Sequence, residues 1–335
     1  MTAKLTRKTI LDLVRGFQPA CAVIAGAELD VFTILHGKPM NAARLARRIK
    51  GDLRATTILL DALAALGLLD KRETDREPVY RVVPAAAEIL TESGSQGMLG
   101  TLRHQGNCLR RWGQLAGVVL SGRPAARQPS MRGAGDDLVS FIRAMHEISE
   151  PMAEPLIRSL GPLKFKRLLD LGGASGTWTI PFLRLNPEAC AIIFDQPDVI
   201  PLAKRRMKQV GLAGRVRLVP GSYCSDALPP GADLAWVSAI VHQNSRAQNR
   251  AMFAKVHSAL VPGGRILIRD IVMDRSRTRP AGGALFAVNM LVATPRGGTF
   301  TFDELREDLS AAGYVNVKYL RRGEGMDSVV CATRR

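Results

Sequence analysis

The amino-acid sequence predicts an α/β protein with a doubly wound, mostly parallel sheet in its second half and a mainly helical domain before it. Three observations carry this prediction. Seven short apolar runs follow residue 160, and amphipathic helical patterns separate the earlier ones. The first of these runs ends in a glycine-rich turn, as the first strand of a nucleotide-binding βαβ unit does. The first 120 residues instead repeat apolar residues at helical spacing.

The N-terminal domain is predicted to span residues 1–122. Residues 41–49 place a polar cap before an amphipathic helix, and residues 54–69 form a second helical pattern. Two short strands around a charged turn follow, and the second strand covers residues 79–83. Helix, helix, hairpin is the order of a winged helix. Residues 84–91 then start another helix with proline in its first turn.

The connection between the two domains is predicted to span residues 123–160. Its first part, residues 123–137, is rich in glycine, arginine and proline, which is typical of a linker. One or two helices follow and lead into the second domain, residues 161–335. There the apolar runs predict the strands of the doubly wound sheet.

Size and composition predict a cytoplasmic globular protein. A chain of 335 residues with 46% hydrophobic residues can bury a large core in about two domains. We found no apolar run of the ~20 residues that a membrane span needs. The apolar residues 19–27 are followed at once by Glu28 and Asp30, so they predict a buried helix rather than a secretory signal. The five cysteines include no CxxC pair and predict buried thiols.

The charge balance does not identify a partner. The net charge is +17, and the excess is spread along the chain, with +8 over residues 1–130 and +9 over residues 131–335. A diffuse positive charge favours anionic partners only in a general way. An acidic substrate, nonspecific nucleic-acid contact and a solubility effect all remain compatible with it.

The glycine-rich turn predicts a cofactor site. Asp170, Gly172, Ala174 and Gly176 fit the pattern D-x-G-x-small-x-G, whereas no register supplies the G-x-G-x-x-G of a dinucleotide site or a phosphate-binding loop. Such a turn suits S-adenosylmethionine, which has no phosphates and needs a close backbone approach. Asp195 ends the next predicted strand, 19 residues after Gly176, and its carboxylate suits ribose hydroxyls.

These features belong to a wider resemblance that covers nearly the whole chain. The segments DLGGASG, FDQPDVI, GSYCSDALPPGADLAWVSAIVHQ and ALVPGGRILIRD, with ELDVFTILHGKPMNAARLARRI near the N-terminus, resemble the small-molecule O-methyltransferases of the caffeate, hydroxyneurosporene and acetylserotonin type. The resemblance implies a class I methyltransferase domain with a Rossmann-like sheet. It also implies an N-terminal winged-helix dimerisation domain, a homodimer and S-adenosylmethionine as the cofactor.

The resemblance also implies which residues contact the cofactor. In this family an acid binds the adenine amino group, and a lysine lies four positions before the catalytic histidine. Both positions hold a serine here, and each serine keeps a hydroxyl for hydrogen bonding. The residues at the cofactor positions are Gly172 and Gly173 in the turn, Asp195 and Gln196 at the ribose, Ser222 and Tyr223 at the adenine, and Ser238 in place of the lysine.

His242 falls at the family's catalytic base, directly after a predicted strand. A neutral histidine can remove the proton of a hydroxyl group so that the oxygen attacks a methyl group. Asp270 falls at one of the two acids that orient this base, while Phe300 stands where the family has the other. The phenylalanine would form an apolar wall, which suggests an apolar or unusual acceptor.

Further residues are predicted to line the acceptor site. They are Phe141, Met145, Asn289, Met290 and Phe300. The remaining histidines show no metal-ligand spacing with cysteine or acidic residues, so no metal is expected.

Two other functions are compatible with parts of the sequence. A winged helix with basic residues could bind DNA, but residues 54–69 are too apolar for a groove and suit a dimer interface, so no nucleic-acid partner is expected. The substitution at Phe300 leaves open a related enzyme that hydroxylates or decarboxylates. The sequence favours a homodimeric, metal-independent O-methyltransferase that acts on a small, largely apolar metabolite.

Overall fold

The computed structural model describes residues 5–75, 77–94 and 96–335. The chain divides into two units by its internal contacts. The first comprises the residues up to 110 together with 127–147, and the second comprises 111–126 together with 148–335. The charged turn predicted between the two N-terminal strands includes Arg76, which lies outside the described residues.

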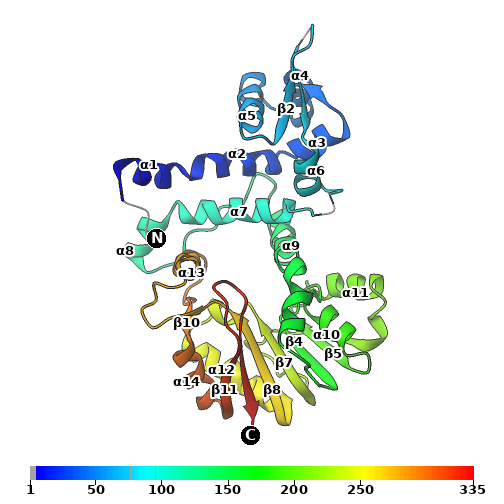
Figure 1. The fold of residues 1–335 in the computed structure, drawn as a ribbon, viewed down its shortest axis with the longest axis vertical. Helices are drawn as coiled ribbons and strands as arrows, with labels where there is room; N and C mark the ends of the chain where they lie inside the picture. Colours follow the sequence, from blue (N-terminus) through cyan, green and yellow to red (C-terminus); the bar gives the residue numbers. More distant parts are fainter. Residues whose placement is uncertain (1–4, 76, 95) are drawn as a thin grey trace. The chain divides into compact units, whose positions relative to one another are not determined.

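The first unit combines helices with a small antiparallel sheet of order β1-β3-β2 (Figure 1). Its strands are β1 (Met40–Asn41), β2 (Leu69–Arg72) and β3 (Val79–Val82). Its helices are α1 (Arg7–Arg15), α2 (Phe17–Glu28), α3 (Val31–Gly37), α4 (Ala42–Ile49), α5 (Leu53–Ala65), α6 (Pro84–Leu90) and most of α7 (Leu99–Trp112). The long helix α9 (Ala134–Ser159) begins in this unit and ends in the second.

Local signals explain the predicted helix-helix-hairpin segment, and the structure confirms it. The Asn41 side chain accepts a hydrogen bond from the backbone N–H of Arg44 and so caps α4. Asp52 caps α5 in the same way through the N–H of Ala55. Gly67 adopts φ 74° just after α5, a left-handed conformation that suits glycine and turns the chain into β2.

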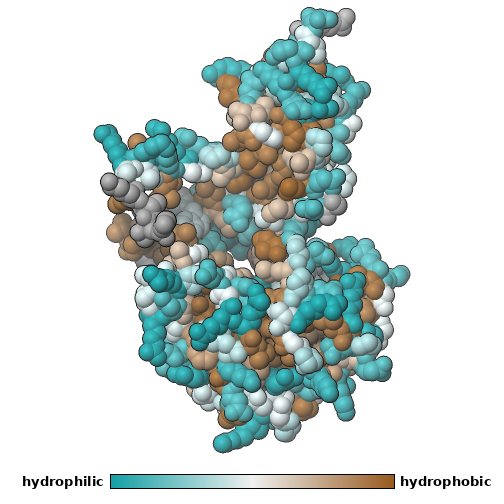
Figure 2. All heavy atoms as spheres, in the orientation of Figure 1, coloured by the Kyte–Doolittle hydropathy of each residue, from teal (hydrophilic) through white to brown (hydrophobic). Residues whose placement is uncertain are grey.

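The prediction that residues 19–27 form a buried helix is wrong in one respect. These residues are helical, but within α2 only Gly26 and Ala27 are buried, and Phe17 is 53% exposed. The stretch Arg7–Glu28 is also long and apolar enough to cross a membrane by length and composition alone, with 17% of its most apolar window buried. The described residues therefore leave much of this apolar surface uncovered. Figure 2 also shows apolar residues gathered around α5 and β2.

The second unit is built on a seven-stranded sheet of order β11-β12-β8-β7-β4-β5-β6, which confirms the predicted doubly wound sheet. Strands β8, β7, β4, β5 and β6 run parallel, and β12 pairs antiparallel with β8 on one side and with β11 on the other. The strands are β4 (Arg167–Leu171), β5 (Cys190–Asp195), β6 (Val216–Pro220), β7 (Ala232–Ser238), β8 (Leu260–Asp270), β11 (Tyr314–Arg321) and β12 (Ser328–Arg334).

Helices cover both faces of this sheet (Figure 1). One face packs against α12 and α14, and the other packs against α10, α11 and the end of α9. The remaining elements of this unit are α8 (Leu115–Ser121), α10 (Thr179–Leu185), α11 (Ile200–Gln209), α12 (Arg246–Ala259), α13 (Ala281–Ala293), α14 (Phe302–Ala311), β9 (Val272–Met273), β10 (Phe300–Thr301), and the 3-10 helices η1 (Ala213–Arg215) and η2 (Val241–Gln243).

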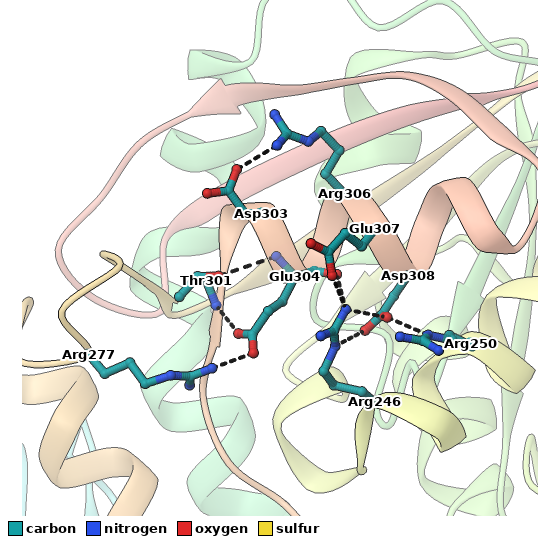
Figure 3. Close-up of polar contacts among 9 residues, drawn as sticks. All are labelled: Arg246, Arg250, Arg277, Thr301, Asp303, Glu304, Arg306, Glu307 and Asp308. Atoms are coloured by element: carbon teal, nitrogen blue, oxygen red, sulfur yellow. Dashed lines mark hydrogen bonds and ion pairs between the residues drawn. The ribbon is translucent and has the colours of Figure 1, made fainter.

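Charged side chains join α12 to α14 (Figure 3). The carboxylate of Asp308 is 1% exposed and accepts hydrogen bonds from Arg246 at 2.8 and 3.0 Å and from Arg250 at 2.6 Å. We expect Asp308→Ala to lower the free energy of unfolding by about 2–3 kcal/mol, because three charge-assisted hydrogen bonds are lost. Urea denaturation measures this change.

Glu307 provides the matched control for Asp308. It also contacts Arg246, at 2.7 Å, but its side chain is 63% exposed, so solvent screens the pair. Glu307→Ala should change the free energy of unfolding by less than ~1 kcal/mol. Equal losses for the two variants would show that burial of Asp308 does not strengthen the network.

Candidate active site

The glycine turn follows β4 and has little room for side chains. Gly172 adopts φ 64°, and a Cβ placed on it would lie 2.7 Å from Cδ1 of Ile240. A Cβ on Gly173 would lie 2.8 Å from Cγ of Asp170. Ala174 adopts φ 47°, which is uncommon for a residue with a side chain. Strained backbone of this kind is typical of ligand-binding turns.

Asp195 at the end of β5 is tied to this turn. Its carboxylate accepts hydrogen bonds from the backbone N–H groups of Ala174 and of the next residue, Gln196, each at 2.7 Å. Burial raises the pKa of Asp195. A carboxylate has about four acceptor positions, so two remain for hydroxyl groups such as those of a ribose. Gln196 is exposed beside it.

Asp170 lies beneath the turn and is buried. Its carboxylate accepts a hydrogen bond from the Thr179 hydroxyl at 2.5 Å. Desolvation, with a smaller contribution from the charge of Asp195, raises the pKa of Asp170 from 3.8 to about 7. The sequence pattern includes Asp170 as its first residue but assigns it no role of its own. The structure shows that it supports the turn from beneath.

The raised pKa of Asp170 predicts a pH-dependent stability. The folded state binds this proton more tightly than the unfolded state, so the stabilisation is complete below pH 3.8 and disappears as the pH rises to about 7. The cost at neutral pH is at most about 4 kcal/mol. Asp170→Asn removes this penalty, so we expect it to raise Tm relative to wild type more at pH 8 than at pH 5. An identical Tm difference at both pH values would contradict the assignment.

The loop after β6 carries Ser222 and Tyr223 and is held against α12. The Lys255 ammonium group donates to the carbonyl oxygens of Tyr223 and Cys224, each at 2.9 Å. The Tyr223 hydroxyl lies 3.4 Å from Oδ1 of Asn244, which follows η2. Ser222 and Tyr223 therefore lie on one loop, and Lys255 fixes the path of that loop. The sequence did not indicate this role for Lys255.

His242 lies in η2, just after β7, and pairs with the last residue of β8. Its Nδ1 lies 2.9 Å from both carboxylate oxygens of Asp270, and the two residues are 6% and 1% exposed. This contact places the Nδ1 proton toward the carboxylate and leaves Nε2 as the basic nitrogen. Asp270 Oδ1 also accepts the backbone N–H of Ile271 at 2.8 Å, which fixes its own orientation.

Phe286 of α13 packs edge-to-face on the imidazole of His242. The ring centroids are 4.8 Å apart and the planes meet at 89°. Sequence reasoning missed Phe286 and chose its neighbours instead. The only signal was the apolar character of residues 284–292, which is equally typical of a core helix.

A loop before α14 closes on the backbone of His242. The N–H of Gly298 donates to the His242 carbonyl oxygen at 2.9 Å. Arg277 donates to the carbonyl oxygen of Thr299 at 3.0 Å and forms an ion pair with Glu304 (Figure 3). Glu304 is thereby fixed to the loop while its carboxylate also caps α14. His242 is held from two sides, by Asp270 and by this loop.

Three of the residues predicted to line the acceptor site lie in the second unit. Asn289 on α13 accepts a hydrogen bond from the indole N–H of Trp112 at 2.9 Å, and Met290 next to it is 7% exposed. Phe300 in β10 is 9% exposed and belongs to the core cluster that includes Val272. Its ring therefore packs among apolar side chains.

The other two predicted lining residues lie on the part of α9 that belongs to the first unit. Phe141 is 40% exposed and packs edge-on against His104 of α7, with ring centroids 5.1 Å apart. Met145 is half-buried one turn further along the helix.

The fold is Rossmann-like, and comparison with solved structures shows that methyltransferases share it. Human N-acetylserotonin methyltransferase in complex with S-adenosylmethionine matches with a TM-score of 0.81 at 24% identity, over 100% of this chain and 99% of that one. A structure of PigF with S-adenosylhomocysteine matches with a TM-score of 0.86 at 23% identity, over 98% and 100% of the two chains.

The family follows from the sequence comparisons. The model of the O-methyltransferase domain matches residues 129–315, and that of the O-methyltransferase dimerisation domain matches residues 11–92. The tetracenomycin polyketide synthesis 8-O-methyl transferase TcmO of Streptomyces glaucescens is 32% identical over 314 residues, which cover 92% of this chain and 91% of the relative. The chain belongs to the S-adenosylmethionine-dependent O-methyltransferases that act on small molecules.

A second relative has a similar level of identity. The 3-hydroxy-5-methyl-1-naphthoate 3-O-methyltransferase of Streptomyces sahachiroi is 29% identical over 336 residues, which cover 97% of this chain and 94% of the relative. Both relatives are named for methylation of an oxygen atom.

Proposed function

We propose that this chain transfers the methyl group of S-adenosylmethionine to a hydroxyl group of a small, largely apolar metabolite, with His242 as the general base. The observation that carries the proposal is the buried pair of His242 and Asp270 at 2.9 Å, at the carboxyl end of the parallel strands. The ligands of open α/β sheets bind at this edge.

The chain's own residues then have distinct tasks. His242 Nε2 takes the proton of the acceptor hydroxyl, and the Asp270 carboxylate stabilises the imidazolium that forms. The acceptor oxygen gains a bond to the methyl carbon while the carbon–sulfur bond of the bound cofactor breaks and its electron pair stays on sulfur. The glycine turn and Asp195 hold the cofactor so that the two reacting atoms meet in line.

Asp195 and the loop of Ser222 and Tyr223 are the proposed ribose and adenine contacts. Gly172 and Gly173 provide the close backbone approach, and Gln196 and Ser238 border the same edge. Asp195 at the end of β5 and the loop after β6 are neighbours, because β5 pairs with β6 and Asp195 lies opposite Pro220, the last residue of β6. Ribose and adenine could therefore be bound side by side.

The proposed acceptor is apolar around its reacting hydroxyl, and an aromatic polyketide is the class we favour. Phe286 packs on the base, and Met290 and Phe300 add apolar surface within the same unit. TcmO and the naphthoate methyltransferase are named for aromatic or polyketide substrates, which supports the proposal by analogy.

The proposed assembly is a cytoplasmic homodimer formed through a winged-helix N-terminal domain, residues 1–122, with residues 123–160 as the connection and 161–335 as the catalytic domain. The match to a dimerisation domain over residues 11–92 supports it. So does the exposed apolar surface, which includes Phe17 at 53%, Leu53 at 51% and Ile58 at 54%. A second copy of the chain would cover this surface.

Incubation with methyl-labelled S-adenosylmethionine tests the proposed reaction. Hydroxynaphthoates and polycyclic phenols serve as acceptors, and their O-methyl ethers and hydroxylated sugars serve as matched controls. We expect label in the phenols only, detected as a mass increase of the product. Cofactor binding without label in any acceptor, or consumption of an acceptor without methylation, would overturn the proposal.

A further inference from the structure

Arg269 places a buried positive charge at the cofactor edge of the sheet. It is the second-last residue of β8, and it is 2% exposed. Its guanidinium lies 4.3 Å from the ring centre of Trp178, and Nη2 lies 3.2 Å from the sulfur of Met152. Within the described residues its Nε has no hydrogen-bond partner. Burying a charge without an anion is costly, so the location calls for an explanation.

The charge persists at neutral pH. Burial lowers the pKa of Arg269 to about 10, and the carboxylates of Asp270 and Asp327 oppose this shift only in part. The guanidinium is therefore protonated at pH 7. It points away from the catalytic base, because Arg269 and Asp270 are successive residues of a strand and their side chains lie on opposite faces of the sheet.

Ser238 connects this charge to the surface of the site. Nη1 of Arg269 donates a hydrogen bond to the Ser238 hydroxyl oxygen at 2.9 Å, and the two residues are register partners in β7 and β8. Ser238 is the last residue of β7 and is partly exposed. Trp178, whose ring contacts the guanidinium, comes two residues after Gly176 of the glycine turn. The cation thus contacts both the residue that ends β7 and a residue that follows the turn.

The hydrogen-bond direction determines what Ser238 can bind. A hydroxyl group has one donor and two acceptor positions. Because its oxygen already accepts from a guanidinium, its O–H is free to donate, and the adjacent charge strengthens that donation. The preferred ligand of such a hydroxyl is an anion. The family that the chain resembles has a lysine at the position of Ser238. In this chain the positive charge comes from Arg269 on the neighbouring strand instead.

The strand order indicates which part of the cofactor reaches Ser238. Strand β4 with its glycine turn lies between β5 and β7. Asp195, the proposed ribose contact, ends β5, whereas Ser238 ends β7 on the opposite side of the turn. S-adenosylmethionine carries its carboxylate at the end remote from the adenine. Its sulfonium is positively charged and would be repelled by Arg269, so the carboxylate is the group that suits this location.

We propose that Ser238 and Arg269 form an anion-binding pair for the carboxylate of the methionine part of S-adenosylmethionine. Ser238 donates its O–H to the carboxylate, and Arg269 is a positioning residue that supports the hydroxyl from beneath. The inference rests on the proposed placement of the ribose at Asp195.

Isothermal titration tests the pair with two ligands, S-adenosylmethionine and its decarboxylated analogue. We expect Ser238→Ala and Arg269→Met each to weaken S-adenosylmethionine binding by about 10–100-fold, which corresponds to one charge-assisted hydrogen bond. Binding of the decarboxylated analogue should not change. The double variant should bind S-adenosylmethionine with about the same affinity as the single variant that binds it less tightly, because both residues act through one contact.

An equal loss of affinity for both ligands would overturn the proposal and show a structural role for Arg269. Additive losses in the double variant would also overturn it. Arg265→Met is the matched control, since Arg265 lies four residues before Arg269 in β8 and donates to the Lys164 carbonyl oxygen. If Arg269→Met does not fold, Ser238→Ala with both ligands still decides the question. His242→Ala should retain wild-type affinity for both ligands, so a failure of the proposed catalytic base is separate from a failure of this pair.

Discussion

His242→Ala should lower kcat/KM for methyl transfer by about 10²–10⁴-fold, the usual contribution of a positioned general base. The imidazole is the group that would take the acceptor proton, and the buried Asp270 carboxylate at 2.9 Å can assist only through it. Binding of S-adenosylmethionine should not change, because the proposed cofactor contacts come from other elements. Steady-state methylation assays and titration calorimetry measure the two quantities separately.

His257→Ala serves as the control for a histidine of the same domain. His257 lies in α12 and packs on Tyr314, with ring centroids 5.1 Å apart, so it has no part in the proposed chemistry. It should leave kcat/KM within a few-fold of wild type. Full turnover by His242→Ala would eliminate the base assignment.

Asp195→Ala should weaken S-adenosylmethionine binding by about 10²-fold or more. The variant loses the two acceptor positions that we propose for the ribose, and charge-assisted hydrogen bonds contribute about 1.5–3 kcal/mol each. It also removes the acceptor of the Ala174 N–H, so the glycine turn loses the contact at 2.7 Å that joins it to β5. Titration with S-adenosylmethionine measures the loss directly.

The exposed Asp198, three residues further along, is the matched control for Asp195. Asp198→Ala makes the same change in net charge, so any effect of charge on the cofactor should appear in both variants. We expect no more than a two-fold change for Asp198→Ala. Comparable losses for the two variants would mean that long-range charge, rather than a ribose contact, accounts for the affinity.

Local signals in the sequence were sufficient for most elements of the fold. The strand runs, the caps at Asn41 and Asp52 and the turn at Gly67 act within a few residues, so they can be interpreted without knowing the tertiary structure. Exposure could not be judged in the same way. Residues 19–27 are apolar, and apolarity predicts burial, but nothing local shows whether the same chain or another molecule covers a helix.

The sequence by itself determined the class of cofactor site, because a glycine turn and an acid at the end of the next strand are local features of one βαβ unit. It also placed His242 after a strand. Only the tertiary structure decided which residues meet there. Asp270 is 28 residues from His242, Phe286 comes from a separate helix, and Arg269 reaches Ser238 from the neighbouring strand. Strand order and register bring these side chains together, and both depend on long-range pairing that no single segment encodes.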